Sequence, residues 1–276
     1  MGVLKAGLIG EHISRTRLPK ALEIMCALNG WTLEFTLIDT AELPGFDFAA
    51  KVDELHADGW TGVTVTHPWK THAADYAGPQ MLRDLRGLGA SNTLVFSDPL
   101  TGHNTDYTGF LGAWAAHMNR TPGRVAMAGA GGVARALGPA LARLGATDIA
   151  VWDLNADLAE ELVRKIGGPA RVVDPADADD AIQQADGLVN ATPLGMREYP
   201  GSAFAAGLLG AQAWAFDAVY TPTNTRFLQD AAAADLQTLS GFRLFQHMAM
   251  GSFAAYTGIR VDPAEMLPKL DALKPD

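Results

Sequence analysis

The sequence contains a single cysteine, Cys26, among its 276 residues. One cysteine cannot form a disulfide within the chain, so the disulfide-rich class of secreted proteins is excluded. A chain without such cross-links favours a reducing compartment, and we expect a cytoplasmic protein. Cys26 itself lies in a run that predicts an apolar helix, and we interpret it as a packing residue.

Basic residues are scarce as well. Lys and Arg number 21 against 31 Asp and Glu, the formal net charge is −10, and no basic run occurs. A nucleic acid or an anionic membrane surface attracts positive charge, so neither is an expected partner. We expect a small-molecule substrate instead, and a chain that is a monomer or a homodimer.

Long apolar runs and metal-ligand patterns are also missing. No stretch approaches the roughly 20 apolar residues that a membrane span needs, and no charged leader precedes the first predicted strand. No spacing of Cys, His and carboxylate residues is typical of a metal site, and His12 and His72 have no partners at ligand spacing. We therefore predict a soluble chain without a bound metal.

The chain instead alternates strand-like and helix-like patterns. Apolar strands are predicted at residues 4–9, 31–38 and 62–66, and helices at 19–29 and 48–57. Such alternation favours an α/β fold with a mainly parallel sheet. Ligands of parallel sheets bind beyond the carboxyl ends of the strands, so the polar residues that follow Gly10 and Thr64 lie where a site is expected.

The stretch from Met127 to Ala136 predicts a dinucleotide-binding turn. An apolar run leads through glycines into an alanine-rich helical pattern. In that fold Gly129 allows the turn, Gly131 lets a pyrophosphate approach the backbone, and Ala134 lets helix and strand pack closely, with the phosphates at the helix N-terminus. An ordinary glycine-rich turn is the alternative. The predicted cofactor-binding residues of the turn are Gly129, Ala130, Gly131, Gly132, Val133 and Ala134.

Asp153 predicts which dinucleotide is bound. It ends a second apolar run, about 20 residues beyond the glycines, where the fold places an acid to accept hydrogen bonds from the adenosine ribose. A carboxylate there repels a 2′-phosphate, so the expected cofactor is NAD rather than NADP. A solvated turn aspartate is the alternative.

The length of the chain suggests two domains. We predict an N-terminal α/β substrate domain with a mainly parallel sheet, residues 1–106, completed by C-terminal helices at 242–276. Residues 107–241 are predicted to form a Rossmann-type dinucleotide-binding domain.

Three polar clusters precede the nucleotide motif, at residues 64–70, 92–93 and 104–106. A lysine just past a strand end that faces an aspartate from another loop is a suitable general acid/base pair, because burial and pairing bring a pKa toward its working range. Lys70 and Asp106 are candidates for such a pair. Residue chemistry alone leaves another interpretation open, in which Lys70 is a surface lysine and Asp106 caps the helix that follows.

Five motifs together resemble the shikimate/quinate dehydrogenase family, in the family's order along the chain. Gly62-Val-Thr-Val-Thr-His-Pro-Trp-Lys70 resembles its G-x-N-V-T-x-P-x-K motif. Gly89-Ala-Ser-Asn-Thr93 and Gly102-His-Asn-Thr-Asp106 match G-A-x-N-T and G-x-N-T-D. Gly129-Ala-Gly-Gly132 matches G-A-G-G, and Asn190-Ala-Thr-Pro-Leu-Gly-Met196 resembles N-A-T-P-x-G-M.

The resemblance implies a role for each matching residue. Lys70 and Asp106 would be the catalytic pair, Asn92 and Thr66 would hold substrate hydroxyls, and the last helix would fold back onto the first domain. The full set of expected substrate-binding residues is Ser14, Thr16, Thr64, Thr66, Asn92, Tyr220 and Met248. Beyond the glycine turn, the expected cofactor-binding residues are Asp153, Asn190, Thr192 and Val219.

The chain departs from the family's first motif, S-x-[ST]-P, whose two hydroxyls bind the substrate carboxylate. Aligned on Pro19, this sequence has Thr16 but Leu18 in place of the second hydroxyl. In an extended segment Ser14, Thr16 and Leu18 share one side. Ser14 and Thr16 are therefore expected to form a displaced clamp, and serine at position 18 is expected to restore the original one.

Two further departures fall on residues that would face the substrate ring. Thr64 replaces the family asparagine, and Met248 aligns with the family glutamine of the last helix. Gln246 is nearby in sequence, but two residues turn a helix by roughly 200°, so it should point elsewhere.

These observations favour an oxidoreductase. The resemblance implies NAD-linked, reversible hydride transfer at a ring secondary alcohol of a hydroxylated cyclohexene or cyclohexane carboxylate. The three departures keep two alternatives open: a family member that acts on a different hydroxy acid, and a nucleotide-dependent regulatory or binding protein with little turnover.

Overall fold

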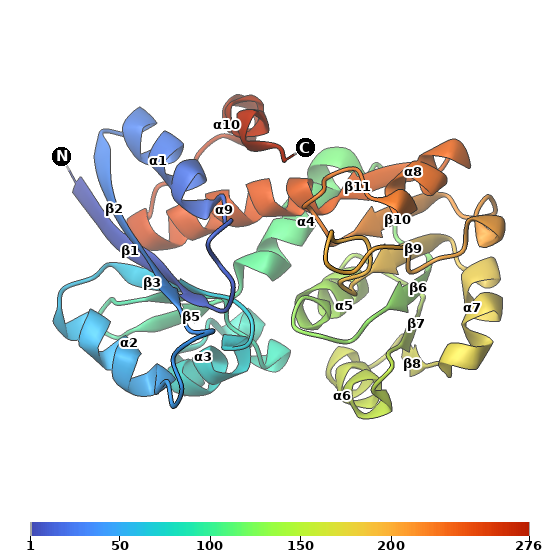
Figure 1. Cartoon of the computed structure of the whole chain (residues 1–276), viewed down its shortest axis with the longest axis horizontal. Coiled ribbons are helices and arrows are strands. Elements are labelled where there is room, and N and C mark those ends of the chain that lie inside the picture. Colours follow the sequence, from blue (N-terminus) through green and yellow to red (C-terminus); the bar gives the residue numbers. More distant parts are fainter. Residues whose placement is uncertain (1, 276) are drawn as a thin grey trace. The chain divides into compact units, whose positions relative to one another are not determined.

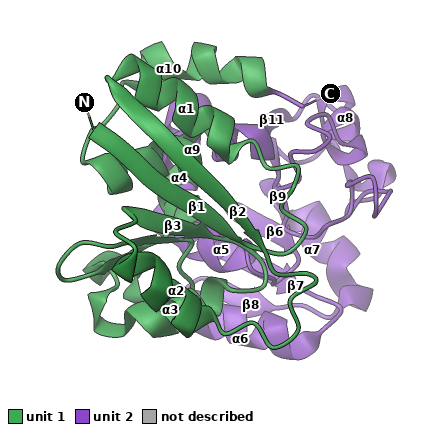
Figure 2. Cartoon of the chain, turned by 60° about the vertical axis from the view of Figure 1, so that its left-hand side comes forward, with its two compact units in different colours: residues 1–109, 246–273 green, residues 110–245, 274–276 purple. Residues whose placement is uncertain are grey.

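The computed structural model describes residues 2–275 and divides into two compact units (Figures 1 and 2). Unit 1 comprises Met1–Gly109 and Gln246–Leu273, and unit 2 comprises Phe110–Phe245 and Lys274–Asp276. The two borders lie three and four residues beyond the ones predicted from sequence, inside helices α4 (Thr105–His117) and α9 (Gly241–Thr257). The part of the last helix that follows residue 245 belongs to unit 1.

Unit 1 contains a five-stranded, mixed sheet in the order β2-β1-β3-β4-β5. Its strands are β1 (Gly2–Gly10), β2 (Trp31–Asp39), β3 (Gly62–Val65), β4 (Thr93–Val95) and β5 (Thr101–His103). Strands β2, β1 and β3 are parallel, as the alternating pattern predicts, and β4 pairs antiparallel with both β3 and β5. The strand order reverses between β1 and β3, so the loops that follow these two strands diverge from a common point.

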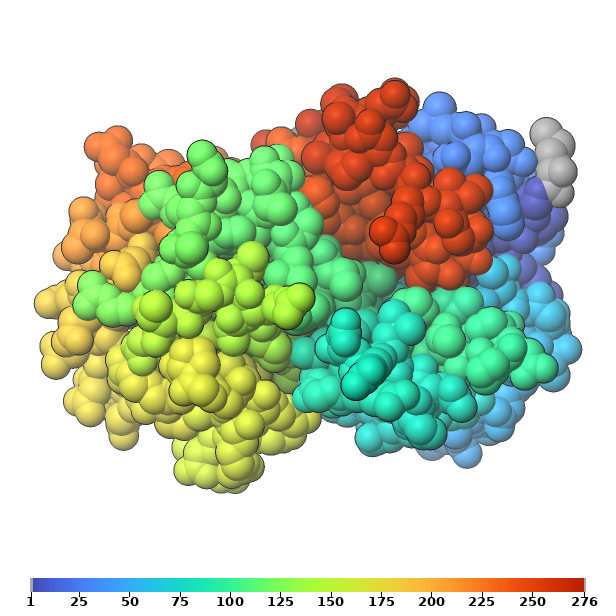
Figure 3. All heavy atoms as spheres, turned by 180° about the vertical axis from the view of Figure 1, so that it is seen from behind, coloured from blue at the N-terminus to red at the C-terminus, as the bar shows by residue number. Residues whose placement is uncertain are grey.

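Helices cover both faces of this sheet. One face packs against α2 (Phe48–Ala57) and α3 (Lys70–Ala77), whose apolar residues share a core with β1, β3 and β4. On the other face lie α1 (Leu18–Leu28) and α9 (Figure 1). Gly62 of β3 has room for no side chain there, because a Cβ would meet the Leu94 carbonyl and the Tyr256 ring. Helix α10 (Pro263–Leu270) packs on α1, and their surfaces adjoin in Figure 3.

Unit 2 contains a six-stranded parallel sheet in the order β8-β7-β6-β9-β10-β11. Its strands are β6 (Arg124–Ala128), β7 (Asp148–Trp152), β8 (Ala170–Val172), β9 (Gly187–Asn190), β10 (Trp214–Asp217) and β11 (Gln237–Ser240). Counted within the unit, this is the 3-2-1-4-5-6 order of the dinucleotide-binding fold, with its switch point between β6 and β9.

The helices of unit 2 lie on both faces of its sheet. Helices α7 (Ala178–Gln184) and α8 (Arg226–Ala233) share a core with the alanines of β6 and β10. The other face of β10 meets α4, because Phe216 and Trp214 point there and pack edge-on against Phe110 and Trp114. Helices α5 (Ala134–Arg143) and α6 (Ala156–Ile166) pack on each other.

Three elements of unit 1 differ from the sequence prediction. Helix α3 was not predicted. The segment at 80–88, whose pattern favours a helix, forms short 3₁₀ turns at Gly78–Gln80 and Arg83–Leu88, and the polar residues at 102–106 include strand β5. Across residues 2–275, none of the helices combines the length and the apolar character that a membrane crossing requires.

Candidate active site

The switch point of the unit 1 sheet lies at the carboxyl ends of β1 and β3, where polar residues follow both strands. The backbone of Thr66 continues the pairing of β3 with β1, since its N–H donates to the Ile9 carbonyl at 2.9 Å. The N–H of Glu11 donates to the His67 carbonyl at 3.0 Å, so the two loops leave the sheet side by side. Residues at this edge therefore lie where an open sheet binds ligands.

Lys70 and Asp106 meet at this edge. The Nζ of Lys70 lies 2.6 Å from Oδ2 of Asp106, and the two side chains are 17% and 12% exposed. The interpretation of Lys70 as an isolated surface lysine is therefore wrong. A partly buried amine and carboxylate in direct contact, with a side still open to solvent, can exchange a proton with a hydroxyl placed beside them.

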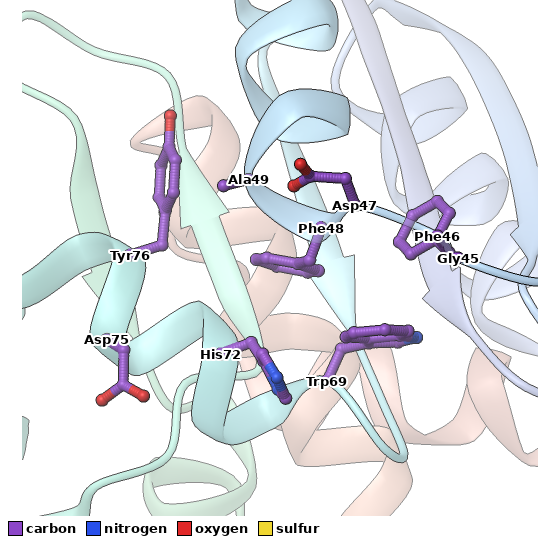
Figure 4. Close-up of a pocket in the computed structure, with 9 residues that line it drawn as sticks. All are labelled: Gly45, Phe46, Asp47, Phe48, Ala49, Trp69, His72, Asp75 and Tyr76. Carbon is purple, nitrogen blue, oxygen red and sulfur yellow. The ribbon is translucent and has the colours of Figure 1, made fainter.

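An aromatic cluster fixes the residue before the lysine. Trp69 stacks on Phe48 with ring centres 5.8 Å apart and packs on Phe46 at 5.1 Å. Its Nε1 donates to Oγ1 of Thr40 at 2.8 Å. These rings line a cavity of about 550 Å³ on the α2 and α3 side of unit 1, and Figure 4 shows them with the neighbouring polar side chains. None of the predicted site residues lines this cavity, so the cavity lies outside the candidate active site. The aromatic side chains around it anchor the start of α3.

Asp106 is held by the start of α4. The side-chain oxygen of Asn92 accepts hydrogen bonds from the N–H of Thr105 at 2.6 Å and from its hydroxyl at 3.1 Å. The helix is capped by Asn104, whose side chain accepts from the Tyr107 N–H at 3.0 Å and donates to the Ala90 carbonyl at 2.9 Å. Asn104 therefore takes the capping role, and the carboxylate of Asp106 is left for Lys70.

Of the two substituted ring-facing positions, Thr64 contacts α9 and Met248 lies on it. The Thr64 hydroxyl lies 2.7 Å from that of Tyr256, and both residues are buried. Met248 is half-buried, and its sulfur accepts from the Ser252 hydroxyl at 3.6 Å. Gln246 is fully buried and bonds to Asp271 at 3.0 Å, so the prediction that it points elsewhere is confirmed.

The loop after β1 differs from its prediction. Ser14 lies in a turn that is closed by a hydrogen bond from the Thr16 N–H to the Ile13 carbonyl at 3.0 Å, so the segment is not extended. The premise of a displaced clamp on one side of a strand is therefore wrong. Thr16 is half-buried and accepts from the Leu18 N–H at 3.3 Å, and Leu18 is a buried residue of α1.

Serine at position 18 is consequently expected to destabilise the protein rather than to restore a carboxylate clamp. Leu18 is 2% exposed within the apolar core. Removing such a side chain costs roughly 2 to 5 kcal/mol, and a buried hydroxyl without a partner adds to that cost. Urea unfolding of Leu18→Ser beside the exposed control Leu28→Ser measures this, and equal midpoints for the two variants would contradict it.

In unit 2 the glycine turn opens from the carboxyl end of β6. Gly129 has a φ of +95°, and a Cβ there would lie 2.8 Å from the Ala191 backbone, so only glycine fits where this loop meets the one after β9. A Cβ at Gly131 or Gly132 would meet no atom within 4 Å. The turn then enters α5 at Ala134. This backbone fits an approaching pyrophosphate at the N-terminus of a helix.

Asp153 closes one side of the same turn. Its Oδ2 accepts from the Ala130 N–H at 2.8 Å and its Oδ1 from the Asn155 N–H at 2.9 Å. The carboxylate that follows β7 is thus fixed beside the glycines rather than left in solvent. Its position fits recognition of the ribose next to the pyrophosphate.

The loops after β9 and β10 carry the remaining predicted residues. Asn190 is fully buried, and its side chain accepts from the N–H and hydroxyl of Thr192 and donates to the Leu194 carbonyl and to Asp217. All its hydrogen-bonding groups are used, so its side chain shapes the loop and offers nothing to a ligand. Tyr220 stacks on Phe245 with ring centres 5.5 Å apart.

Sequence reasoning missed Tyr256 and Asp217. Each is buried and pairs with a residue that was predicted, Thr64 and Asn190 respectively. Burial raises the pKa of both groups, that of Asp217 to about 6. The position of Asp217, at the end of an apolar strand, was a signal of the same kind as that of Asp153. Among residues 2–275, no group of three or more His, Cys, Asp and Glu side chains is arranged to hold a metal ion.

Comparison with known proteins places this geometry in a family. Residues 8–94 match the model of the shikimate dehydrogenase substrate binding domain. A quinate/shikimate dehydrogenase (NAD(+)) of Corynebacterium efficiens is 34% identical over 270 residues, which cover 94% of this chain and 95% of the relative. A shikimate dehydrogenase (NADP(+)) of Streptomyces avermitilis is 35% identical, covering 97% and 94% of the two chains.

Solved structures agree in fold. The quinate dehydrogenase of Corynebacterium glutamicum in complex with NAD has a TM-score of 0.89 and 32% identity, covering 98% of this chain and 99% of that one. A shikimate 5-dehydrogenase of Listeria monocytogenes in complex with shikimate and NAD has a TM-score of 0.84 and 26% identity, covering 98% and 96%. With its sequence and both units matched over nearly their full length, the chain belongs to the shikimate/quinate dehydrogenase family.

Proposed function

We propose that the protein is an NAD-dependent dehydrogenase of hydroxylated cyclohexene or cyclohexane carboxylates such as shikimate or quinate. The direct contact of Lys70 with Asp106 at the switch point of unit 1 is the observation that carries this proposal. Membership of the family supports the reaction, and the NAD-linked relatives support the cofactor. Unit 1 would bind the substrate and unit 2 the cofactor.

The protein's own part in the reaction is to place the alcohol and move its proton. Lys70 and Asp106, in direct contact, take the hydroxyl proton during oxidation and return it during reduction. A nicotinamide dinucleotide held by the glycine turn and Asp153 would supply the hydride acceptor or donor. Asn92 uses its side-chain oxygen on Thr105, so its NH₂ group is the part that donates to substrate. Thr66, at the same edge, supplies a hydroxyl.

The proposed substrate site is less polar than the family pattern. Thr64 shares a hydrogen bond with Tyr256 at a position where the family has an asparagine. Thr16, Tyr220 and Met248 complete the proposed substrate contacts, and Ser14 is not among them because its segment forms a turn. Fewer polar groups face the ring than the family pattern supplies, and each unpaired substrate oxygen costs roughly 1 to 3 kcal/mol. We therefore propose weak binding of shikimate and quinate.

The proposal is tested by absorbance at the reduced-nicotinamide band, with shikimate, quinate and related hydroxy acids against NAD and NADP. Turnover of at least one ring acid with NAD is expected. Tight binding of a ring acid without turnover would favour a regulatory protein, the alternative that the substitutions at Leu18 and Met248 suggest. Turnover of only an acyclic hydroxy acid would contradict the proposed substrate class.

Met248→Gln is expected to lower the Michaelis constant for shikimate or quinate. Met248 is half-buried beside Ser252, and glutamine of similar length brings an amide to substrate oxygens at the same position. One recovered hydrogen bond is worth about 1 kcal/mol, or roughly fivefold. Met248→Leu, which has no polar group, is the matched control. A lower Michaelis constant in both variants, or in neither, would contradict the role of the amide.

The single cysteine and the negative charge support a cytoplasmic protein without nucleic-acid or membrane partners, acting as a monomer or homodimer on small molecules. Size-exclusion chromatography with light scattering separates the two assembly states.

A further inference from the structure

Asp217 is a buried carboxylate that the proton-transfer chemistry does not use. It ends β10 with a side chain that is 0% exposed, and it has no cationic partner among its hydrogen bonds. Burial of an unpaired charge is costly, and here it raises the pKa of the group to about 6. A buried carboxylate is therefore expected to accept hydrogen bonds that a neutral side chain would accept less well.

Three donors converge on this carboxylate. Nδ2 of Asn190 donates to Oδ1 at 2.9 Å and the N–H of Val219 donates to the same oxygen at 3.0 Å. The hydroxyl of Thr225 donates to Oδ2. An ionised carboxylate only accepts, so it matches all three, whereas an amide would turn a donor toward one of them.

The three donors belong to three segments at the cofactor edge of unit 2. Asn190 shapes the loop after β9 by bonding to Thr192 and Leu194. Val219 begins the loop that carries Tyr220. Thr225 accepts from the Leu228 N–H at 3.3 Å and so caps α8. One carboxylate therefore ties together both loops that follow the central strands and the helix beyond them.

The connection extends to the glycine turn. Gly129 meets the backbone of Ala191 so closely that a Cβ would lie 2.8 Å from it. Displacement of the loop after β9 would consequently disturb the turn that is proposed to hold the pyrophosphate.

We propose that Asp217 is a positioning residue of the cofactor site, one that holds Thr192 and Val219 in place for the nicotinamide half of the dinucleotide without touching it. This inference rests on the proposed function. Charge-assisted hydrogen bonds are roughly twice as strong as neutral ones, so the hold is firm while Asp217 is ionised and loosens when it is protonated.

The groups around Asp217 are neutral, so its own ionisation controls the hold. Asn190 lies on β9, Ser240 is its register partner on β11, and Gly241 starts α9 against its backbone. Val219 and Thr225 donate to its carboxylate, and a Cβ at Gly195 would lie 3.9 Å from Oδ2. None of these residues is charged. With a pKa of about 6, Asp217 is ionised at pH 8 and protonated at pH 5.

The test is equilibrium binding of NADH, followed by nicotinamide fluorescence from pH 5 to 9, together with kcat and KM for NAD. In the wild type, NADH affinity is expected to fall as the pH drops through about 6. Asp217→Asn mimics the protonated state. It is expected to bind NADH at pH 8 as weakly as the wild type does at pH 5, to lose on the order of tenfold in kcat/KM for NAD, and to show no such pH transition.

Asp186→Asn is the matched control. Asp186 bonds to Arg124 at the opposite, amino edge of the same strands, so this variant is expected to lose stability while its NADH affinity stays that of the wild type. If Asp217→Asn likewise changes only stability, with wild-type NADH affinity at every pH, the positioning role is overturned. Absence of NADH binding by the wild type would instead contradict the proposed function itself.

A second pair of variants decides the question if Asp217→Asn does not fold. The Thr225 hydrogen bond lowers the pKa of Asp217, so Thr225→Val should move the pH transition in NADH affinity upward, and Thr225→Ser should leave it in place. The same transition pH in both variants would contradict the role of Asp217.

Discussion

Lys70→Ala and Asp106→Ala are each expected to lower kcat by about 10²- to 10⁴-fold, the contribution that a positioned proton-transfer group makes. Both side chains lie in unit 1 and are in contact at 2.6 Å, so the loss of either removes half of one acid/base pair. Neither belongs to the glycine turn of unit 2, and NADH affinity should stay near that of the wild type. Initial rates with the best ring acid and nicotinamide fluorescence measure the two effects.

Lys51→Ala provides the matched control for this result. Lys51 forms an ion pair of 2.7 Å with Glu54 on the surface of α2. The Lys51→Ala variant therefore also removes a lysine and a salt bridge from unit 1. Such exposed pairs contribute roughly 0 to 1 kcal/mol, and turnover should not change. Retention of more than about half of the wild-type kcat by either active-site variant would remove that residue from the proton path.

Asp153→Asn is expected to weaken the preference for NAD over NADP by about 10- to 100-fold in kcat/KM. The carboxylate lies beside the glycine turn, where its Oδ2 bonds to the Ala130 N–H. The amide keeps an acceptor for that N–H but loses the charge-assisted bonds to ribose hydroxyls, worth roughly 1.5 to 3 kcal/mol, and no longer repels a 2′-phosphate. Michaelis constants for both cofactors at a saturating ring acid measure the change.

Asp148→Asn controls for a change of net charge in the same strand. Asp148 starts β7 at its amino end and pairs with Arg171, away from the turn. Its NAD:NADP ratio should match the wild type. A wild-type enzyme that uses NADP as well as or better than NAD would refute the assignment of Asp153.

Secondary-structure elements were predicted well where the spacing of apolar residues and the capping residues at the ends indicate the same bounds. Helix α2 has the predicted bounds because the side chain of Asp47 caps it and its apolar residues Phe48, Val52 and Leu55 repeat at helical spacing. Helix α3 lacked such a signal: Lys70–Ala77 has alanines as its buried residues and polar side chains between them. Strand β5 has three residues and is held by pairing with β4, a contact that no local pattern contains.

The candidate site also contains some residues that local sequence patterns predict and others that they do not. Lys70 and Asp106 are 36 residues apart in sequence, and they were predicted as a pair because each belongs to a recognisable motif. The path of the chain after β1 could not be predicted, because the choice between a strand and a turn at Ser14 depends on a backbone bond between Ile13 and Thr16. Tyr256 and Asp217 act through buried partners, and burial is a property of the folded chain.

The division of unit 1 into two stretches of chain has a consequence for how the protein is made. Residues 1–109 leave the ribosome before unit 2, and the second stretch of unit 1, Gln246–Leu273, follows only after residue 245. At roughly 5 to 20 residues per second, the face of β3 that Tyr256 covers waits on the order of 10 s for its helix. Unit 2 lies almost wholly in one stretch, and that stretch is synthesised in this interval. Unit 1, which holds Lys70 and Asp106, therefore cannot cover this face of its sheet until the second of its two stretches has been made.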